Sequence, residues 1–213
     1  MYIGEYMTSS PITIPTGLLI PEARKLMNEF GIRHLPVVDS GRKLVGIVTD
    51  RDLRSAYPSA VLTRYQRQLA FDQVEKTEVA EIMTTTCTTL SPDASLDDAL
   101  LIFDRDKVGG IPVISEEGVV LGIFSLLDLT AAYRKLFGIE EKGSVLLGVE
   151  DDGRENILCE ITALLEKQGI PVTRLIRLEE KSDDARIYMR INTMRPVEVI
   201  KLLRASGFVL TSF

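Results

Sequence analysis

The chain has 213 residues, of which 45% are hydrophobic and 26% charged, a composition typical of globular proteins with one to three domains. Its formal net charge of −6 argues against broad electrostatic binding of nucleic acid or anionic membranes. Cys87 and Cys159 are far apart and form no CxxC pair, so we expect free thiols. Neither a signal peptide nor an apolar run of membrane-spanning length is evident, and we expect a cytoplasmic protein.

The first 130 residues contain an internal repeat with a period of 76 positions and no gap. The matched pairs include Met7-Thr8 with Met83-Thr84, Pro36-Val37 with Pro112-Val113, Gly46-Ile47 with Gly122-Ile123, and Asp52-Leu53 with Asp128-Leu129. A repeat of fixed period indicates a doubled structural unit whose copies bury a face against each other.

The first copy has the pattern of strand, helix, strand, strand and helix. Apolar residues at helical spacing predict a helix over 20–30, and Pro21 suits its first turn. Short apolar runs predict strands at 12–14, 35–39 and 44–48, followed by a short helix at 50–57. The core-facing stripe of the first helix is expected to be Ile20, Ala23, Met27 and Phe30.

The second copy repeats this order, with Ser95 as the cap of its first helix. Paired strands are predicted at 111–115 and 119–124, and the helix stripe is Leu96, Ala99, Leu100 and Phe103. Between the copies, residues 60–75 have a helical pattern and form a connector or lid. Its apolar residues are Val61, Leu62, Tyr65, Leu69 and Val74.

After Gly138 the pattern changes to strand, helix, strand, strand, helix and strand. Strands are predicted at 145–149, 172–178, 187–192 and 208–211, with a charged hairpin loop at 179–184. Gly169 ends the helix that begins near Ile157, and Pro196 begins the next, which Gly207 ends. This βαββαβ order is the ferredoxin-like plan.

The strongest chemical signal is the corner from Thr49 to Asp52, where a predicted strand ends and a helix begins at once. Free N–H groups at a helix start suit phosphate, and the Thr49 hydroxyl adds a donor there. The two carboxylate oxygens of Asp52 match the two hydroxyls of a ribose, and Arg51 can neutralise phosphate charge. Gly46 permits close approach of the backbone.

The three-residue spacing of Thr49 and Asp52 is also that of a capping box, and a single copy of this pattern is more often a helix cap than a ligand site. The second copy, Ser125 with Asp128, shifts the balance towards a site. For His34, the only histidine, a polar strand-edge residue and a contact to the base of a ligand carry equal weight. We find no catalytic triad, metal-ligand cluster or P-loop, so we expect no enzyme activity and no metal.

The two copies resemble cystathionine-β-synthase (CBS) domains, and the pair resembles a Bateman module over residues 1–137. The segments that carry the resemblance are Arg33-His34-Leu35-Pro36-Val37-Val38, Gly46-Ile47-Val48-Thr49-Asp50-Arg51-Asp52, Gly109-Gly110-Ile111-Pro112-Val113-Ile114 and Gly122-Ile123-Phe124-Ser125-Leu126-Leu127-Asp128. The resemblance implies CBS domains at 1–58 and 77–137, a helical connector at 59–76, and a pseudo-symmetric pair. Such modules bind AMP, ADP, ATP, S-adenosylmethionine or NAD.

The resemblance also assigns roles to residues. Asp52 and Asp128 would hold ribose, while Thr49 and Ser125 would contact phosphate beside Asp50 and Arg51. The segments expected to flank adenine contain His34, Leu35, Pro36, Gly110, Ile111 and Pro112, with Ile12 and Thr88 on the other side. The first copy, with Arg33, His34 and Arg51, is the richer one for an anionic ligand. The second copy has Gly109, Gly110 and Leu127 there, and binds a less charged adenosyl ligand, binds weakly, or is empty.

Residues 144–213 resemble an ACT domain, on the stretches Gly148–Ile161 and Gly169–Val172. ACT domains bind amino acids where the first strand meets the first helix, which points to Asp152, Asn156 and Ile157. Asn156 stands where the family has glycine, so the left-handed turn survives but the side chain intrudes on the ligand space. A purely dimerising ACT unit is at least as well supported. The order CBS, CBS, ACT is similar to that of acetoin-utilisation proteins of the AcuB type.

We therefore expect an α+β protein with a pair of CBS domains and a C-terminal ACT domain. Its expected function is that of a non-enzymatic regulator, a homodimer that binds an adenosine-containing effector between the CBS repeats. An interaction scaffold with empty sites, and amino-acid sensing through the ACT domain, are the alternatives.

Overall fold

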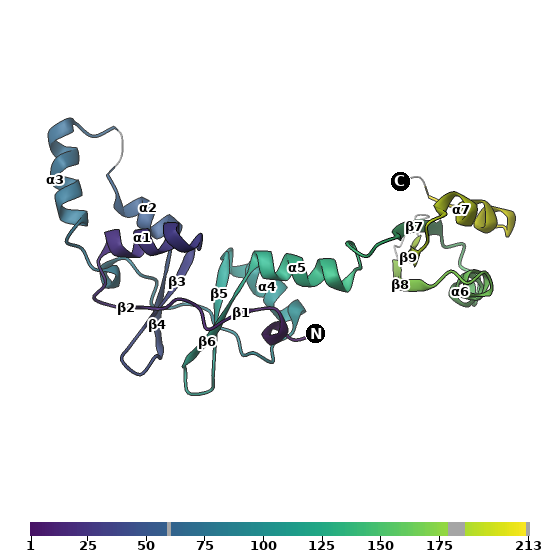
Figure 1. Ribbon diagram of the computed structural model, residues 1–213, viewed down its shortest axis with the longest axis horizontal. Coiled ribbons are helices and arrows are strands. Elements are labelled where there is room, and N and C mark those ends of the chain that lie inside the picture. Colours follow the sequence, from purple (N-terminus) through teal and green to yellow (C-terminus); the bar gives the residue numbers. More distant parts are fainter. Residues whose placement is uncertain (59–60, 179–185, 212–213) are drawn as a thin grey trace. The chain divides into compact units, whose positions relative to one another are not determined.

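The computed structural model describes residues 1–58, 61–178 and 186–211, which divide into two compact units, Met1–Ala132 and Tyr133–Phe213 (Figure 1). The first unit contains both sequence repeats. The second unit contains the βαββαβ segment. In the described part of the chain, no helix has the length and apolarity needed to cross a bilayer.

The first repeat has the predicted order of elements. It consists of β2 (Ile14–Pro15), α1 (Ile20–Phe30), β3 (His34–Val38), β4 (Leu44–Thr49) and α2 (Asp50–Ala56). β3 lies between β2, its parallel neighbour, and β4, its antiparallel neighbour. The stripe prediction is wrong at Phe30, which is 54% exposed, because α1 ends there at the left-handed Gly31 and the core contacts stop at Met27.

The second repeat is built in the same way, with each element about 76 residues further along the chain. It contains α4 (Leu96–Asp106), β5 (Gly110–Ile114), β6 (Val120–Ser125) and α5 (Leu126–Leu136). β5 and β6 are antiparallel, and Leu90 pairs in parallel with Val113 as Ile14 pairs with Val37. On α4 the predicted stripe is buried except at Leu100, which is 44% exposed.

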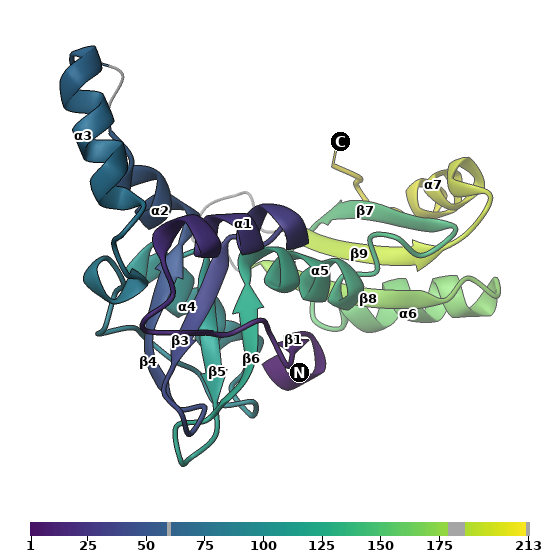
Figure 2. The same cartoon turned by 60° about the vertical axis from the view of Figure 1, so that its left-hand side comes forward.

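The two repeats exchange the segments that precede them. β1 (Thr8–Ser9) pairs with β6 of the second repeat, where Thr8 lies opposite Ile123. The equivalent residue, Thr84, pairs with Ile47 of the first repeat, just after the 3-10 turn η2 (Val79–Glu81). The hairpins β3–β4 and β5–β6 lie side by side and meet at the bridge between Lys43 and Val119 (Figure 2). Each repeat therefore pairs with the segment that precedes the other repeat, and the two repeats belong to one compact unit.

Two glycines make this exchange sterically possible. A Cβ at Gly122 would overlap Met7 Sδ, and a Cβ at Gly46 would lie 2.8 Å from Met83 Sδ. Distances below 3.0 Å require something to move. The glycine of each repeated Gly-Ile pair thus lies where the exchanged segment packs against a strand of the other repeat.

The connector contains α3 (Arg64–Val74), which begins at a capping box of Thr63 and Gln66. Of its predicted apolar residues, only Val74 is buried, whereas Val61, Tyr65 and Leu69 are 90%, 74% and 52% exposed. Its contacts with the first repeat include a tilted ring pair of Tyr57 and Phe71. Most of the helix is therefore held by its own hydrogen bonds.

The second unit contains β7 (Ser144–Glu150), α6 (Ile157–Lys167), β8 (Val172–Leu178), β9 (Arg186–Asn192) and α7 (Pro196–Ala205). The strand order is β7-β9-β8, all antiparallel neighbours. The predicted last strand is reduced to a bridge of Leu210 to Val149, which continues the sheet beyond β7 in the ferredoxin-like order. The predicted hairpin loop at 179–184 lies outside the described residues.

Candidate functional site

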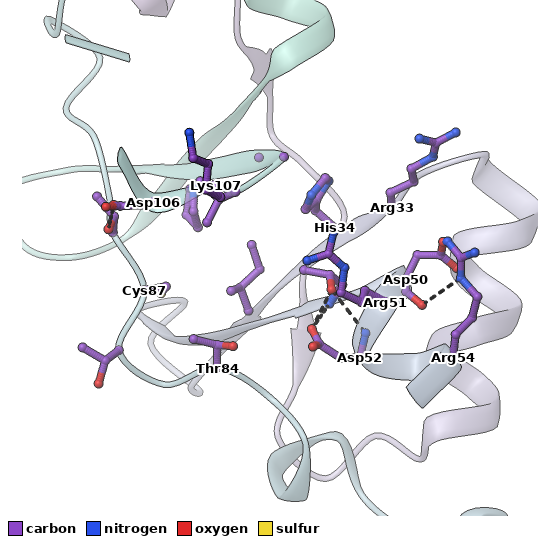
Figure 3. A pocket seen from close by; sticks show the side chains of 18 of the residues that line it. Arg33, His34, Asp50, Arg51, Asp52, Arg54, Thr84, Cys87, Asp106 and Lys107 are labelled. Atoms are coloured by element: carbon purple, nitrogen blue, oxygen red, sulfur yellow. Dashed lines mark hydrogen bonds and ion pairs between the residues drawn. The ribbon is translucent and has the colours of Figure 1, made fainter. Parts of the chain in front are cut away.

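A pocket of about 730 Å³ lies between the two repeats of the first unit. This volume is within the range of small-molecule sites, about 300–1,000 Å³. Its walls come from residues 33–54 of the first repeat and from residues 84–88 and 105–112, which precede and form the start of β5. Figure 3 shows Asp106 and Lys107 across the pocket from Arg51 and Asp52.

The corner from Thr49 to Asp52 forms the predicted capping box at the start of α2. The Thr49 hydroxyl and amide donate to Asp52 Oδ2 at 2.7 and 2.8 Å, and the Asp52 amide donates back to Thr49 Oγ1 at 3.3 Å. Within the described residues, Asp52 Oδ1 accepts no hydrogen bond. A carboxylate oxygen has two lone-pair positions, so the cap and a ligand contact are compatible on one side chain.

Fewer backbone N–H groups are available at this corner than the sequence suggests. The Asp50 amide donates to the Arg33 carbonyl at 3.0 Å, and the Asp52 amide is occupied by Thr49. α2 is also only seven residues long. The amides of Asp50 and Asp52 are therefore not available to an anion.

Five basic and three acidic side chains line the pocket, a local excess of cations in a chain of net charge −6. They are Arg33, Arg51, Arg54, Arg105 and Lys107, with Asp50, Asp52 and Asp106. Arg54 pairs with Asp50, Arg105 with Asp106, and Lys107 with Asp104. In the described structure, the side chains of Arg33 and Arg51 form no ion pair or hydrogen bond. These two guanidinium groups are available to an anion.

The wall opposite Asp52 is also polar. The Thr88 hydroxyl donates to Asp106 Oδ2 at 2.6 Å, and Arg105 donates to both oxygens of the same carboxylate at 2.6 and 3.0 Å. Hydrogen bonds from Arg105 and then from Thr88 lower the pKa of Asp106 to about 2. Asp106 is therefore anionic at neutral pH and fixes Thr88 in the wall.

His34 lines the pocket, and its ring lies close to the backbone of Gly109 and Gly110 in the second repeat. A Cβ at Gly110 would be 3.0 Å from the imidazole Cγ and Nδ1, and one at Gly109 would be 3.1 Å from Nε2. Burial, and then the charge of Arg33, lower the pKa of His34, although Asp52 and Asp50 act in the opposite direction. The imidazole is therefore neutral at pH 7 and presents a flat aromatic surface.

The structure brings nine of the predicted nucleotide-site residues into the pocket. They are Arg33, His34, Thr49, Asp50, Arg51, Asp52, Thr88, Gly110 and Pro112. The side chains of Leu35 and Ile111 are fully buried in the core, and Pro36 is buried as well. Ile12, Ser125 and Asp128 do not line this pocket.

Sequence reasoning missed most of the second repeat's contribution. The additional lining residues are Ile47, Arg54, Thr84, Thr86, Cys87, Arg105, Asp106, Lys107, Val108 and Gly109. The charged run at the end of α4, directly before the Gly109-Gly110 pair, was the available signal. Ile47, Val108 and Pro112 provide apolar surface, and burial raises the pKa of the Cys87 thiol, which keeps it protonated.

The sequence matches the CBS domain model twice, over residues 3–59 and 79–135. The chain belongs to the CBS domain family. It is 30% identical over 164 residues to an inosine-5′-monophosphate dehydrogenase of Aquifex aeolicus, a match that covers 75% of this chain but only 30% of that enzyme. The dehydrogenase relatives thus match through their CBS regions.

Two solved structures share the CBS-pair fold. One is a protein assigned to acetoin utilization (AcuB) from Vibrio cholerae, with 29% identity, a TM-score of 0.55, and coverage of 66% of this chain and 96% of that one. The other is the CBS domain pair of protein MJ0100 in complex with 5′-methylthioadenosine and S-adenosyl-L-methionine, with 28% identity, a TM-score of 0.54, and coverage of 64% and 98%.

The residues expected to bind an amino acid lie where β7 meets α6 in the second unit. Asn156 has a left-handed backbone (φ 67°), as predicted. Arg154 pairs with Asp152 at 2.7 Å and with Glu160 at 3.1 Å, and lowers the pKa of Asp152. Ile157 is 1% exposed and belongs to the core. Of the three, Asp152 is already engaged and Ile157 offers no side-chain surface.

Proposed function

We propose that the chain is a non-enzymatic regulator that binds an adenosine-containing ligand in the pocket between the CBS repeats. The observation that carries the proposal is the joint lining of one pocket by a diol-matching carboxylate, Asp52, and by two unpaired guanidinium groups, Arg33 and Arg51. The complex of the MJ0100 pair with two adenosyl ligands supports the ligand class.

The two unpaired cations favour a ligand with a phosphate over S-adenosylmethionine, which carries a positive charge at its sulfur. We propose AMP, ADP, ATP or NAD, with the ribose on Asp52 Oδ1 and a phosphate on Arg51 and Arg33. The base would lie against the apolar surface of Ile47, Val108 and Pro112. Charge-assisted hydrogen bonds from arginine to phosphate are among the stronger polar contacts in proteins.

Isothermal titration calorimetry with AMP, ADP, ATP, NAD and S-adenosylmethionine tests this proposal. We expect a phosphorylated ligand to bind wild type and to lose at least tenfold in affinity with Asp52→Ala. Asp98→Ala is the matched control, because Ser95 and Asp98 form the same capping box outside the pocket. Equal binding by wild type and Asp52→Ala would contradict the assignment, and turnover of a nucleotide would contradict the non-enzymatic role.

Binding regulates only if the ligand favours one of two states of the pair. The pocket is suited to this, since its two walls come from different repeats. We propose that the ligand shifts the repeats relative to each other. Identical small-angle scattering profiles with and without saturating ligand would argue against this shift.

For the second unit we propose an ACT domain, residues 144–213, that serves dimerisation or signal transmission. Its strand order, with Leu210 beside β7, supports the assignment. The exposed Leu175, Ile176 and Leu178 on β8 support association with a second copy, because an uncovered strand with apolar side chains favours pairing. Amino-acid binding has less support, since Arg154 already occupies Asp152. Analytical ultracentrifugation of Leu175→Glu against wild type tests the dimer.

A further inference from the structure

The connector helix α3 lies outside both CBS domain matches, which cover residues 3–59 and 79–135. Figures 1 and 2 show α3 extending beyond α1 and α2, away from the strands. One side of the helix faces the first repeat, where Val74 is 7% exposed and the ring of Phe71 pairs with that of Tyr57. The residues on the opposite side of α3 are exposed.

The exposed side of α3 carries apolar side chains one helical turn apart. With 3.6 residues per turn, positions three and four apart share a face. Tyr65 and Leu69 lie on this face and are 74% and 52% exposed, and Val61, just before the helix, is 90% exposed. Gln68 and Asp72 lie on the same face and are joined by a hydrogen bond of 2.9 Å. An apolar stripe with polar neighbours is typical of an interaction surface.

The charges of α3 follow the reverse of the order that stabilises an isolated helix. A helix dipole favours anions in the first turn and cations in the last turn. α3 begins with Arg64, contains Asp72 near its end and has Glu75 as its C-cap, with no acidic residue in its first turn and no basic residue in its last. Among the described residues, the Arg64 side chain forms no ion pair that would offset this order.

A second copy of α3 in the antiparallel direction resolves this conflict. It would place Arg64 of each chain beside the Asp72–Glu75 end of the other chain, and Tyr65 of each chain near Leu69 of the other. We infer that α3 is a self-association surface, which pairs with α3 of a second chain about a two-fold axis close to Gln68. In such an isologous contact each interaction occurs twice.

The contact is small, because α3 has 11 residues and is therefore about 16 Å long. This length is too short to bury the roughly 1,000 Å² that a stable interface needs. We therefore expect a weak association, which strengthens when another surface such as β8 already holds the two chains together. The inference goes beyond the dimer proposed through β8, and it does not rest on the nucleotide pocket, which α3 does not line.

Disulfide formation at position 68 tests the contact on the full chain. A disulfide between two residues at the same position is necessarily between chains, and mass spectrometry of the tryptic peptides identifies it. We expect Gln68→Cys to form this link on mild oxidation, because the two positions adjoin the two-fold axis. Gln73→Cys, exposed on another face of the same helix, is the matched control and is expected to link at least fivefold less.

Charge reversal in the Gln68→Cys chain tests the antiparallel order. Arg64→Asp and Asp72→Arg are each expected to lower linking at least fivefold, and the double reversal Arg64→Asp/Asp72→Arg is expected to restore most of it. Arg64→Asp places an anion at the helix start, where the dipole of a single chain favours it. Loss of linking in this variant therefore does not come from unfolding of α3, and hydrogen exchange in α3 no faster than in the parent chain checks this.

The inference is overturned if Gln68→Cys and Gln73→Cys link equally, or if the double reversal links no better than the single reversals. Titration of each variant with AMP is a separate readout. Since α3 does not line the pocket, AMP affinity is expected to stay within twofold of wild type in all of them, whatever the extent of linking. A failure of the α3 contact and a failure of the proposed function are therefore distinguishable.

Discussion

The imidazole of His34 lies against the backbone of Gly110, its own equivalent in the second repeat. A Cβ at position 110 would be 3.0 Å from two ring atoms, a distance at which one group must give way. Since the two positions are 76 residues apart in a 76-residue repeat, the contact crosses the pseudo-two-fold axis of the pair. Only one of the two repeats can carry a side chain at this position, so the first repeat contributes an imidazole where the second contributes only backbone.

Gly110→Ala is expected to destabilise the first unit by about 1–3 kcal/mol, the usual range for overpacking. The backbone of Gly110 does not have a positive φ, so the cost comes from the His34 ring rather than from the backbone. Urea unfolding followed by circular dichroism measures the change. The double variant His34→Ala/Gly110→Ala is the control and should recover most of the loss, whereas equal stability of Gly110→Ala and wild type would contradict the close contact.

The pKa of His34 predicts a loss of stability on acidification. Burial and Arg33 lower this pKa from its ordinary value of 6.5, so the folded state binds the proton more weakly than the unfolded state. The stabilisation is fully present above pH 6.5 and is lost as the pH falls towards the folded pKa. As the only histidine, His34 gives a single imidazole C–H signal whose NMR titration midpoint we expect below 6.5.

His34→Asn is the control for the acid dependence of the remaining groups, and its stability should fall less than that of wild type between pH 7.5 and 5.5. Added AMP should raise the titration midpoint of His34, because a phosphate near the ring favours the imidazolium form. An NMR titration midpoint of His34 above 6.5 in the ligand-free protein would contradict the burial of its ring beside Arg33.

The sequence predicted the elements well because each depends on local periodicity. The 76-residue period placed the helices and strands of both repeats, and the capping-box spacing correctly gave the start of α2 at Thr49. The exchange of the leading segments was not predictable, since the apolar residues Ile3 and Val79 show only that a face is buried and not which sheet buries it.

The predicted residues cover most of the pocket wall of the first repeat, but only Thr88, Gly110 and Pro112 on the wall of the second. Thr49 and Asp52 stand out because their spacing has a local mechanism, the helix cap. Arg105 and Asp106 end the amphipathic helix α4 and Lys107 is its C-cap, and the charged run before Gly109-Gly110 is a weak signal because a solvated helix end has the same composition. They join the pocket only through the packing of one repeat on the other, which the local sequence does not reveal.

The exchanged segment is expected to contribute strongly to stability. Ile3 is fully buried, and its amide and that of Gly4 donate to the carbonyls of Ala94 and Pro92 in the second repeat. Ile3→Ala should cost about 2–5 kcal/mol, the range for truncating a buried isoleucine. Leu101→Ala, at a position 69% exposed in the same repeat, is the control and should cost less than about 0.5 kcal/mol. Similar losses in urea unfolding for both variants would show that the segment is not packed.

Asn156 provides a test of the second unit that is independent of ligands. Its φ of 67° places it in the left-handed region, where a β-branched side chain is strained and glycine is free. Asn156→Val should therefore destabilise the second unit by about 1–3 kcal/mol, while Asn156→Gly should stay within about 1 kcal/mol of wild type. Hydrogen exchange at the start of α6 is the measurement, and faster exchange is expected only in the valine variant.

Asn28→Val, on the exposed face of α1, controls for the change of side chain at an ordinary helical φ. Unchanged exchange in Asn156→Val would mean that the turn adopts a right-handed backbone in solution.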